Sequence, residues 1–359
     1  MAHVTIRDVA RLAGVSDGTV SNAVNRPHLV NAATRDRVLA AMAQLGYIPN
    51  AAARALRIGR SRTIGLVVLD FGNPFFAAVA SGAERAASAA GADIALFNTG
   101  IGRHDREKRL LHRLAERHLD GLVITPHDVN DPLLAVIEDR GAPVVILARE
   151  VPDRRRSAVR SDDVLGGELA ARHLLDLGHR QMAFAGWRHD ERYQGALTLA
   201  RAADATLTWM GTQGDGVSDG LAVGHRLADL PIAERPTAVF CANDLIATGL
   251  VQAVTQHGMR IPRDLAVVGF DDTDLASAAG AVELTSVHQP AEELGEAAVQ
   301  VVLTEMTDPE RGHRDVVFQP RKVMRAGLWH AVDGHVLIYV HKEEVLDDVE
   351  RRYPADHYV

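Results

Sequence analysis

The stretch TIRDVARLAGVSDGTVSNAVN, residues 5–25, decides the fold of the N-terminal region. Four apolar residues in its first half follow the spacing of one helical face: Ile6, Val9, Ala10 and Ala13. Thr5 is placed to cap this helix, and Gly14 is placed to end it in the left-handed conformation. The stretch therefore predicts a short amphipathic helix followed by a tight turn.

A second and a third helix are predicted after this turn. Ser16 caps the second helix, which turns Val20 and Val24 inward. The third helix, AATRDRVLAAMAQLGY (residues 32–47), covers both with a predicted apolar face of Val38, Leu39, Met42 and Leu45. Three helices connected in this way form a helix-turn-helix unit.

Charge divides the chain into a basic start and an acidic remainder. Residues 1–63 contain nine Arg and three Asp, whereas the whole chain carries a formal net charge of −8, so residues 64–359 carry −14. A small basic module before a large acidic body is typical of a nucleic-acid-binding headpiece on a regulatory domain. Charge alone leaves open a solvated basic face.

Length and composition restrict the remaining possibilities. A chain of 359 residues with 47% hydrophobic content indicates two or three globular domains. A single Cys excludes an intrachain disulfide framework, and the His residues lack zinc-site spacing, so we expect neither a structural metal nor a cofactor. The first residues do not resemble a signal peptide, and the chain has no run of 18 apolar residues, which predicts a cytoplasmic protein.

Short apolar segments alternate with amphipathic helical patterns from residue 63 onward. The predicted strands are TIGLVVL, DIALFN, GLVIT, VVILA, QMAFAG, TLTWMG, AVFCA and LAVVGF. Val-, Ile- and Leu-rich runs separated by helices indicate parallel sheets covered on both faces, and the length accommodates two such sheets.

Taken together, these segments resemble the LacI/GalR family of bacterial repressors up to about residue 328. The resemblance is carried by residues 5–25, LGYIPNAAARALRIGRS (45–61), IGLVV (64–68), NPFF (73–76), DGLVI (120–124), LGHRQMAFAG (177–186), AVFCANDLIATG (238–249) and LAVVGFDD (265–272). It implies an all-α helix-turn-helix headpiece followed by an α/β periplasmic-binding-protein-like core of two parallel-sheet subdomains.

The resemblance also implies domain limits. They are the headpiece (1–48), a hinge helix (49–62), an N-subdomain (63–160 with 289–318), a C-subdomain (161–288 with 319–330) and an atypical extension (331–359). In the extension, HVLIYV (335–340) predicts a strand and KEEVLDDVERRY (342–353) an acidic amphipathic helix. This helix is too short for a coiled coil, so we do not expect a tetramer.

The second helix is expected to lie in the major groove, where its N-terminal residues face base edges. Asn22 is suited to bond adenine, and Asp17 either accepts from cytosine or stabilises the helix N-terminus. In the hinge helix the resemblance implies that Leu56 enters the minor groove as a wedge. The full predicted DNA-binding set is Thr5, Ser16, Asp17, Gly18, Thr19, Ser21, Asn22, Asn25, Asn50, Ala53 and Leu56.

In this family the effector binds in the cleft at the carboxyl ends of the strands. The residues carried over are Asn73, Phe75, Arg149, Arg188, Arg192, Asn243 and Asp271. The chain departs from the family where a hydroxyl-reading Asp is common, which is Ala148 followed by Arg149, and at the aromatic stacking position, which is Gly216. The effector is therefore expected to be a sugar or a sugar derivative, with a phosphorylated or acidic ligand left open.

The predicted function is that of a homodimeric, ligand-responsive transcription regulator without enzymatic activity. We expect a repressor of a carbohydrate-related operon that binds double-stranded DNA at a pseudo-palindromic operator. Two alternatives are a phosphotransferase-like enzyme using Asp272 and Asp274, which follow a strand, and a solute-binding protein with the fold of residues 63–328. The resemblance argues against the enzyme, because it assigns this segment to the ligand loop, and no downstream Lys with a paired acid is placed as a phosphotransferase needs. The headpiece and the missing signal peptide argue against the solute-binding protein.

Overall fold

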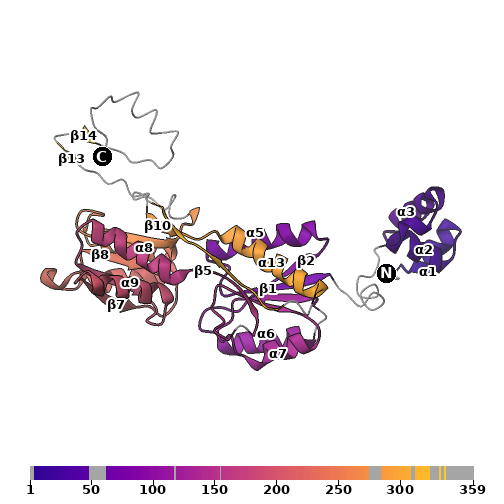
Figure 1. Cartoon of the computed structure of the whole chain (residues 1–359). Coiled ribbons are helices and arrows are strands. Elements are labelled where there is room, and N and C mark those ends of the chain that lie inside the picture. The colour runs from indigo at the N-terminus through magenta and orange to yellow at the C-terminus, as the bar shows by residue number, and fades with distance from the viewer. Residues whose placement is uncertain are drawn as a thin grey trace, which may run out of the picture. The chain divides into compact units, whose positions relative to one another are not determined.

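The computed structural model describes residues 4–47, 62–116, 119–153, 155–274, 284–308 and 312–323, together with two short strands near the C-terminus (Figure 1). The chain divides after Arg62 into two compact units. Each unit has its own hydrophobic core, and the larger unit contains two sheets. The predicted fold class, a helical headpiece followed by two α/β parallel-sheet subdomains, is confirmed.

The N-terminal unit is helical. Its elements are α1 (Ile6–Ala13), α2 (Asp17–Asn25), the 3₁₀ turn η1 (Pro27–Leu29) and α3 (Ala32–Leu45). Thr5 begins α1 by donating its backbone N–H and its hydroxyl to the Asp8 carboxylate, at 3.0 and 2.7 Å. Gly14 ends α1 with φ of 64°, so the predicted cap and left-handed terminus are confirmed.

Two burial predictions for the headpiece are wrong. Leu39 is 48% exposed, because the inner face of α3 is formed by Val38 and Ala41, and Leu39 lies about 100° around the helix from Val38. In α2 the fully buried partner of Val20 is Ala23, whereas Val24 is only half-buried. A small residue at position 23 fits the inner position because the three helices pack closely.

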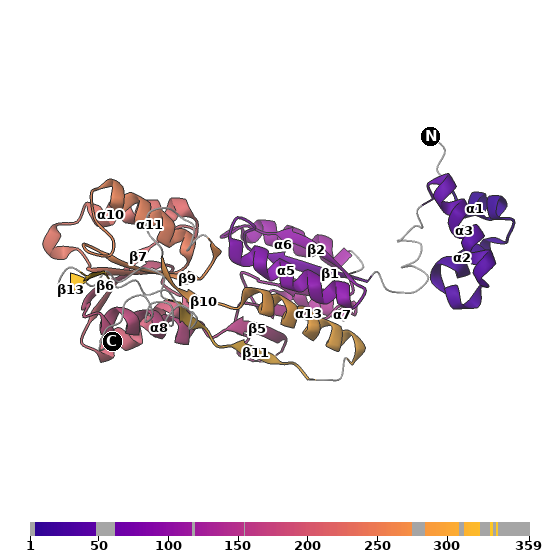
Figure 2. The same cartoon turned by 90° about the horizontal axis from the view of Figure 1, so that it is seen from above.

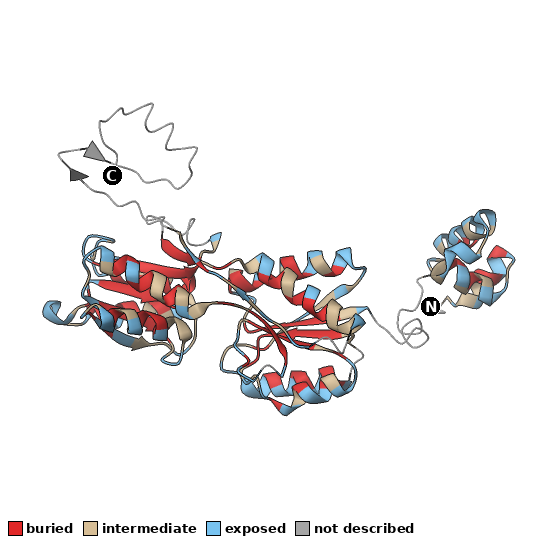
Figure 3. Cartoon of the chain, in the orientation of Figure 1, coloured by how far each residue is buried: buried red, intermediate tan, exposed pale blue. Residues whose placement is uncertain are grey.

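The first sheet of the core has six parallel strands in the order β11-β5-β4-β3-β1-β2. They are β1 (Thr63–Val68), β2 (Asp93–Asn98), β3 (Gly121–Ile124), β4 (Val144–Leu147), β5 (Ser157–Ser161) and β11 (Asp315–Phe318). One face packs on α5 (Pro74–Ala89) and α13 (Ala291–Thr307), the other on α6 (His104–Glu116) and α7 (Pro132–Asp139). Figure 3 shows both layers of buried residues.

The second sheet has the order β12-β10-β9-β8-β6-β7. Its strands are β6 (Gln181–Gly186), β7 (Thr206–Gly211), β8 (Ala238–Cys241), β9 (Ala266–Asp271), β10 (Thr285–His288) and β12 (Arg321–Val323). It packs against α8 (Asp163–Asp176), α9 (Glu191–Ala202), α10 (Val217–Ala228) and α11 (Asp244–Gln256), with the 3₁₀ turn η2 (Ile232–Glu234) before β8. Figure 2 shows α10 and α11 on the face opposite α8.

Three segments cross between the two sheets: from β5 to α8, from β10 to α13 and from β11 to β12. The last of these reverses the chain, so β12 pairs antiparallel with β10, which differs from the predicted all-parallel sheet. All eight predicted strands are present, as β1 to β4 and β6 to β9.

Near the C-terminus, β13 (Ala331–Val332) and β14 (His335–Val336) form an antiparallel pair. The strand β14 coincides with the start of the predicted strand 335–340. The rest of that prediction, and the predicted helix 342–353, lie outside the described residues. No helix in the described part of the chain is long and apolar enough to cross a membrane.

Candidate DNA-binding and effector-binding sites

The N-terminal turn of α2 presents a small, polar and exposed surface. Asp17, Gly18 and Asn22 are all exposed. Asp17 lies 3.7 Å from the guanidinium of Arg7 on α1, a pair in which both side chains remain at least half exposed. The predicted base-reading positions are therefore accessible, and Gly18 contributes no side chain that would keep the backbone away from a partner.

The polar residues beside this face are fixed by local hydrogen bonds. The Ser16 hydroxyl accepts a hydrogen bond from the backbone N–H of Thr19 at 3.1 Å, and a second hydrogen bond joins the hydroxyls of Ser16 and Thr19 at 2.9 Å. The predicted cap of α2 is therefore confirmed. Asn25 donates to the carbonyl of Ser21 at 2.7 Å, within the same helix. Asn50, Ala53 and Leu56 of the predicted hinge helix lie outside the described residues.

The core contains a cavity of about 240 Å³ at the carboxyl ends of strands from both sheets. Six of the seven predicted effector residues line it: Asn73, Phe75, Arg149, Arg192, Asn243 and Asp271. The fold brings together residues that are up to 198 positions apart in the sequence, because the crossing segments place the edges of the two sheets against one another.

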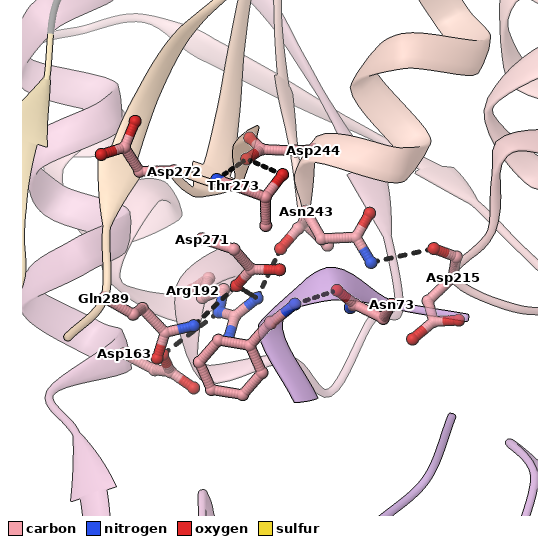
Figure 4. A network of polar contacts seen from close by, with 12 residues as sticks. Asn73, Asp163, Arg192, Asp215, Asn243, Asp244, Asp271, Asp272, Thr273 and Gln289 are labelled. Atoms are coloured by element: carbon pink, nitrogen blue, oxygen red, sulfur yellow. Dashed lines mark hydrogen bonds and ion pairs between the residues drawn. The ribbon is translucent and has the colours of Figure 1, made fainter. Parts of the chain in front are cut away.

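Arg192, the second residue of α9, is the centre of a buried polar network (Figure 4). Its Nε donates to Asp163 Oδ1 at 3.1 Å, its Nη1 donates to the carbonyl of Ala242, and the guanidinium carbon lies 3.8 Å from the centroid of the Phe270 ring. Although burial by itself lowers the pKa of Arg192, the neighbouring carboxylates, with that of Asp163 contributing most, raise it. The guanidinium is therefore a fixed cation.

Asp271 ends β9 at the floor of this network. Its carboxylate accepts from Gln289 Nε2 at 2.7 Å and lies 3.9 Å from Arg192 Nη1. Burial raises the pKa of Asp271 to about 8, and the nearby Arg192 opposes that rise. The backbone at Asp271 has φ of 96°, a conformation that a non-glycine residue rarely adopts, so the surrounding contacts hold this side chain against strain.

Two asparagines cap helices at the cavity wall. The Asn73 side chain accepts from the backbone N–H of Phe75 at 2.9 Å and begins α5. Asn243 accepts from the backbone N–H of Ile246 at 2.8 Å, begins α11, and donates to the backbone carbonyl of Asp215 at 2.9 Å. Both caps fix the orientation of amide groups that border the cavity.

The two remaining predicted arginines differ in position. Arg149 is exposed at the cavity mouth, directly after Ala148, whose φ is 54°. The structure does not place Arg188 among the residues lining the cavity. Its guanidinium instead lies over the Trp209 ring, 5.7 Å from the centroid, on the exposed side of β7. Both arginines follow the end of β6 within six residues, so their positions in the sequence do not tell which of them enters the cavity.

Sequence reasoning missed several cavity residues. Thr125 directly follows β3, Thr212 directly follows β7, and Asp190 and Trp187 lie between β6 and α9. The hydroxyls of Thr125 and Thr212 are buried and have no hydrogen-bond partner among the described residues. Their position directly after predicted strands was the signal that would have found them, since ligands of open α/β sheets bind at the carboxyl ends of strands.

A second polar cluster lies beside the cavity and contains Asp272, one of the two aspartates of the enzyme alternative. Asp272 pairs with His288 at 3.0 Å. Asp244 accepts from Ser286 at 2.7 Å and from the backbone N–H of Thr273 at 2.7 Å, and burial raises its pKa to about 6. These aspartates hold the start of the loop after β9. Among the described residues no three His, Cys, Asp or Glu side chains gather where they would hold a metal ion.

Comparison with known proteins agrees with this architecture. The model of bacterial regulatory proteins of the lacI family matches residues 5–50, and that of the periplasmic binding protein-like domain matches residues 171–327. The HTH-type transcriptional repressor PurR of Aliivibrio fischeri (strain MJ11) is 36% identical over 337 residues, covering 90% of this chain and 98% of the relative. PurR of Vibrio vulnificus (strain CMCP6) is 33% identical, with 89% and 97% covered.

Two solved structures extend the comparison to the whole fold. The transcriptional regulator CelR in complex with cellobiose has a TM-score of 0.66 and 30% identity, with 90% of this chain and 99% of that chain covered. The Lac repressor dimer bound to operator and the anti-inducer ONPF has a TM-score of 0.78 and 26% identity, with the same coverage. Both similarities include the headpiece as well as the core.

A helix-turn-helix headpiece on a two-sheet ligand-binding core defines a ligand-responsive DNA-binding transcriptional repressor rather than an enzyme. The chain belongs to the LacI family of bacterial regulatory proteins. The phosphotransferase alternative is therefore wrong, and so is the solute-binding protein, because the family match includes the DNA-binding headpiece.

Proposed function

We propose that this repressor controls a carbohydrate-related operon by binding a pseudo-palindromic operator as a homodimer. The observation that carries the proposal is the exposure of small and polar residues in the first half of α2, namely Asp17, Gly18 and Asn22. A helix of this kind reads base edges in the major groove, and two-fold related headpieces read two half-sites. The headpiece comprises residues 1–48, the hinge residues 49–62, and the extension residues 331–359.

Within each half-site we assign base reading to Asn22, which bonds an adenine, and to Asp17, which accepts a hydrogen bond from a cytosine. The Arg7 guanidinium beside Asp17 offsets the repulsion between this carboxylate and the DNA phosphates. Thr5, Ser16, Thr19, Ser21 and Asn25 line the phosphates, and Asn50, Ala53 and Leu56 act in the hinge. The proposal for the hinge rests on family resemblance alone.

The homodimer is supported by apolar side chains at the edge of the first sheet. Leu96 on the edge strand β2 is 48% exposed, and Phe71 in the loop after β1 is 43% exposed. Such side chains favour a partner surface over water. A second copy of the chain is the partner that a two-fold operator requires.

The effector cavity favours a hydroxylated ligand over an anionic one. Five carboxylates line it against two arginines: Asp163, Asp190, Glu191, Asp215 and Asp271 face Arg149 and Arg192. A phosphorylated or acidic ligand would enter a site that is already acidic, whereas hydroxyl groups donate to carboxylates. Although Arg149 left an acidic effector open, we therefore propose a hydroxylated effector. The similar regulator CelR, which was solved with cellobiose, agrees with a sugar-type ligand.

The test is a fluorescence-anisotropy titration of the full-length protein onto DNA from the region upstream of its own gene. Specific binding with nanomolar affinity is expected, together with a steep fall as salt is raised, since nine arginines are available in residues 1–63. The titration is repeated with neutral sugars, sugar phosphates and sugar acids. Equal affinity for operator and unrelated DNA, or a response to anionic compounds only, would refute the proposal.

A further inference from the structure

The cavity carboxylates differ in how closely a cation approaches them, and Asp215 lines the cavity without an ion pair to any described side chain. Arg192 is hydrogen bonded to Asp163 and lies 3.9 Å from Asp271. Its positive charge is thus shared by two carboxylates. An additional anion in the cavity would have to compete with both of them.

Arg149, the other cavity cation, acts on a different carboxylate. Burial raises the pKa of Asp190 overall, while the charge of Arg192 and, to a smaller extent, that of Arg149 lower it. Asp190 also caps α9 by accepting from the backbone N–H of Arg192 at 2.9 Å. Arg192, Arg149 and the helix N-terminus together therefore offset the charge of Asp190.

Two cavity carboxylates remain, Glu191 and Asp215. Burial raises the pKa of Glu191, and the nearby Arg160 opposes that rise. Asp215 is the carboxylate considered for a ligand. It lies in the loop between β7 and α10, and its side chain forms no ion pair with any described residue. In Figure 4 its backbone carbonyl accepts from Asn243 while its carboxylate points away from that bond. Burial raises the pKa of Asp215 to about 6, and the largest charge effect on it comes from Asp70, which follows β1 in the other sheet. The negative charge of Asp70 therefore adds to the negative potential at Asp215, although Asp70 is not among the residues that line the cavity.

A second and independent observation points to a hydroxylated ligand in the same cavity. Thr125 is 2% exposed, lines the cavity, and its hydroxyl has no partner among the described residues. The Thr212 hydroxyl, three residues before Asp215, is likewise buried and without a described partner. Buried polar groups are nearly always hydrogen bonded, so these two hydroxyls need a partner that the chain does not supply.

We propose that the effector is a single-ring hydroxylated compound bearing a protonated amine, such as an amino sugar. The amine is held by Asp215, where the nearby charge of Asp70 favours a cation further, and ring hydroxyls bond Thr125 and Thr212. The volume of about 240 Å³ lies below the usual range of about 300–1,000 Å³ for ligand pockets, which favours one ring over two. A neutral ligand would exclude water from the Asp215 carboxylate without supplying a counter-charge, whereas an ammonium group supplies it.

This inference rests on the proposed effector-controlled repressor, and its test separates the two. Binding of glucosamine, galactosamine and mannosamine to the full-length protein is measured by calorimetry in amine-free buffer, each beside its neutral parent sugar and its N-acetyl derivative. At least one amine is expected to bind about tenfold or more tightly than both counterparts, because hydrogen bonds to a charged group are the strong ones. A panel in which no amine exceeds its parent overturns the inference.

Variants locate the amine. Asp215→Asn is expected to lose the preference for the amine while keeping the affinity for the neutral parent, and Asp70→Asn is expected to do the same. Asp229→Asn is the matched control, because Asp229 is exposed and does not line the cavity. An amine preference that survives in both the Asp215 and the Asp70 variant overturns the assignment of Asp215, as does tighter binding of Ca²⁺ than of any amine.

Operator binding is measured in parallel by anisotropy. If the amines fail while specific operator binding is intact, the inference falls and the proposed function stands. If specific operator binding itself fails, the proposed function falls whatever the amines do.

Discussion

A methyl group added at Gly167 should disturb both the stability of the core and the effector site. A Cβ at this position would lie 1.9 Å from the carbonyl oxygen of Arg192, and a Cβ at Gly195 would lie 2.0 Å from the carbonyl oxygen of Val164. The helices α8 and α9 thus pack backbone against backbone. Ordinary contact requires about 3.4 Å, so Gly167→Ala must separate the two helices by roughly 1.5 Å.

The cost follows from this separation. Alanine is worth about 1 kcal/mol more than glycine in a helix interior, whereas overpacking against rigid backbone costs about 1–3 kcal/mol or more. The displaced group is Arg192 itself, so its 3.1 Å bond to Asp163 also lengthens beyond hydrogen-bond distance. With about 1.5–3 kcal/mol for the lost hydrogen bond between charged groups, the net loss is about 3 kcal/mol, which lowers the melting temperature of a unit of about 300 residues by about 5 °C.

The assay is thermal unfolding of the full-length protein by calorimetry, followed by effector titration. Gly295→Ala is the matched comparison, since its Cβ would lie 1.9 Å from the carbonyl oxygen of Val79 in the pair α5 and α13. It should destabilise the core by a similar amount without separating Arg192 from Asp163. Gly312→Ala, with no atom within 4 Å, should change neither quantity. A Gly167→Ala protein that melts at or above the wild-type temperature would refute this reasoning.

Three further outcomes are expected. Asn22→Ala should weaken operator binding by about 1–3 kcal/mol and relax selectivity at one base position, as read by anisotropy on operator variants; a uniform loss on all sequences would contradict base reading. Leu56→Ala should weaken operator binding strongly while the core melts unchanged, and unaltered binding would remove the proposed hinge wedge. Because burial raises the pKa of Asp271 from its ordinary value near 4 to about 8, its contribution to stability is fully present below about pH 4 and is lost progressively until about pH 8. Asp271→Asn should therefore flatten the decline of the melting temperature between about pH 4 and pH 8, and a slope equal to that of the wild type would contradict this assignment.

The pattern of apolar residues along the sequence predicted most of the fold, because most strands and helices are clearly apolar where they are buried. The strands β1, β3, β4, β6, β8 and β9 are fully or almost fully buried, so their sequences are continuous apolar runs. The strands β5 and β11 escaped prediction because Ser157, Arg160 and Asp315 interrupt them. Their polar side chains are satisfied by one another in the fold, as in the pair between Arg160 and Asp315 at 3.0 Å, and a single segment does not reveal such a partner.

The cavity was predictable in position but not in charge. The strand-end rule located Asn73, Asn243 and Asp271, since each follows or ends an apolar run. Whether an arginine is available to a ligand depends on which carboxylates already bind it. For Arg192 the partner Asp163 comes from a different helix, 29 positions away, and that pairing depends on the close approach of α8 and α9.

The same residues connect the cavity to the segments that cross between the sheets. Gln289, which is 3% exposed, lies between β10 and α13 and donates to Asp271 at 2.7 Å. Asp162, between β5 and α8, donates its backbone N–H to the carbonyl of Phe318 and caps α8 with its side chain. A ligand that donates a hydrogen bond to the Asp271 carboxylate competes with Gln289 for the same acceptor group. Because Gln289 belongs to a crossing segment, occupancy of the cavity is coupled to the conformation of that segment. A differential contact of this kind is what coupling requires, and couplings between sites are typically about 1–3 kcal/mol, a range that the exchange of one or two buried hydrogen bonds supplies.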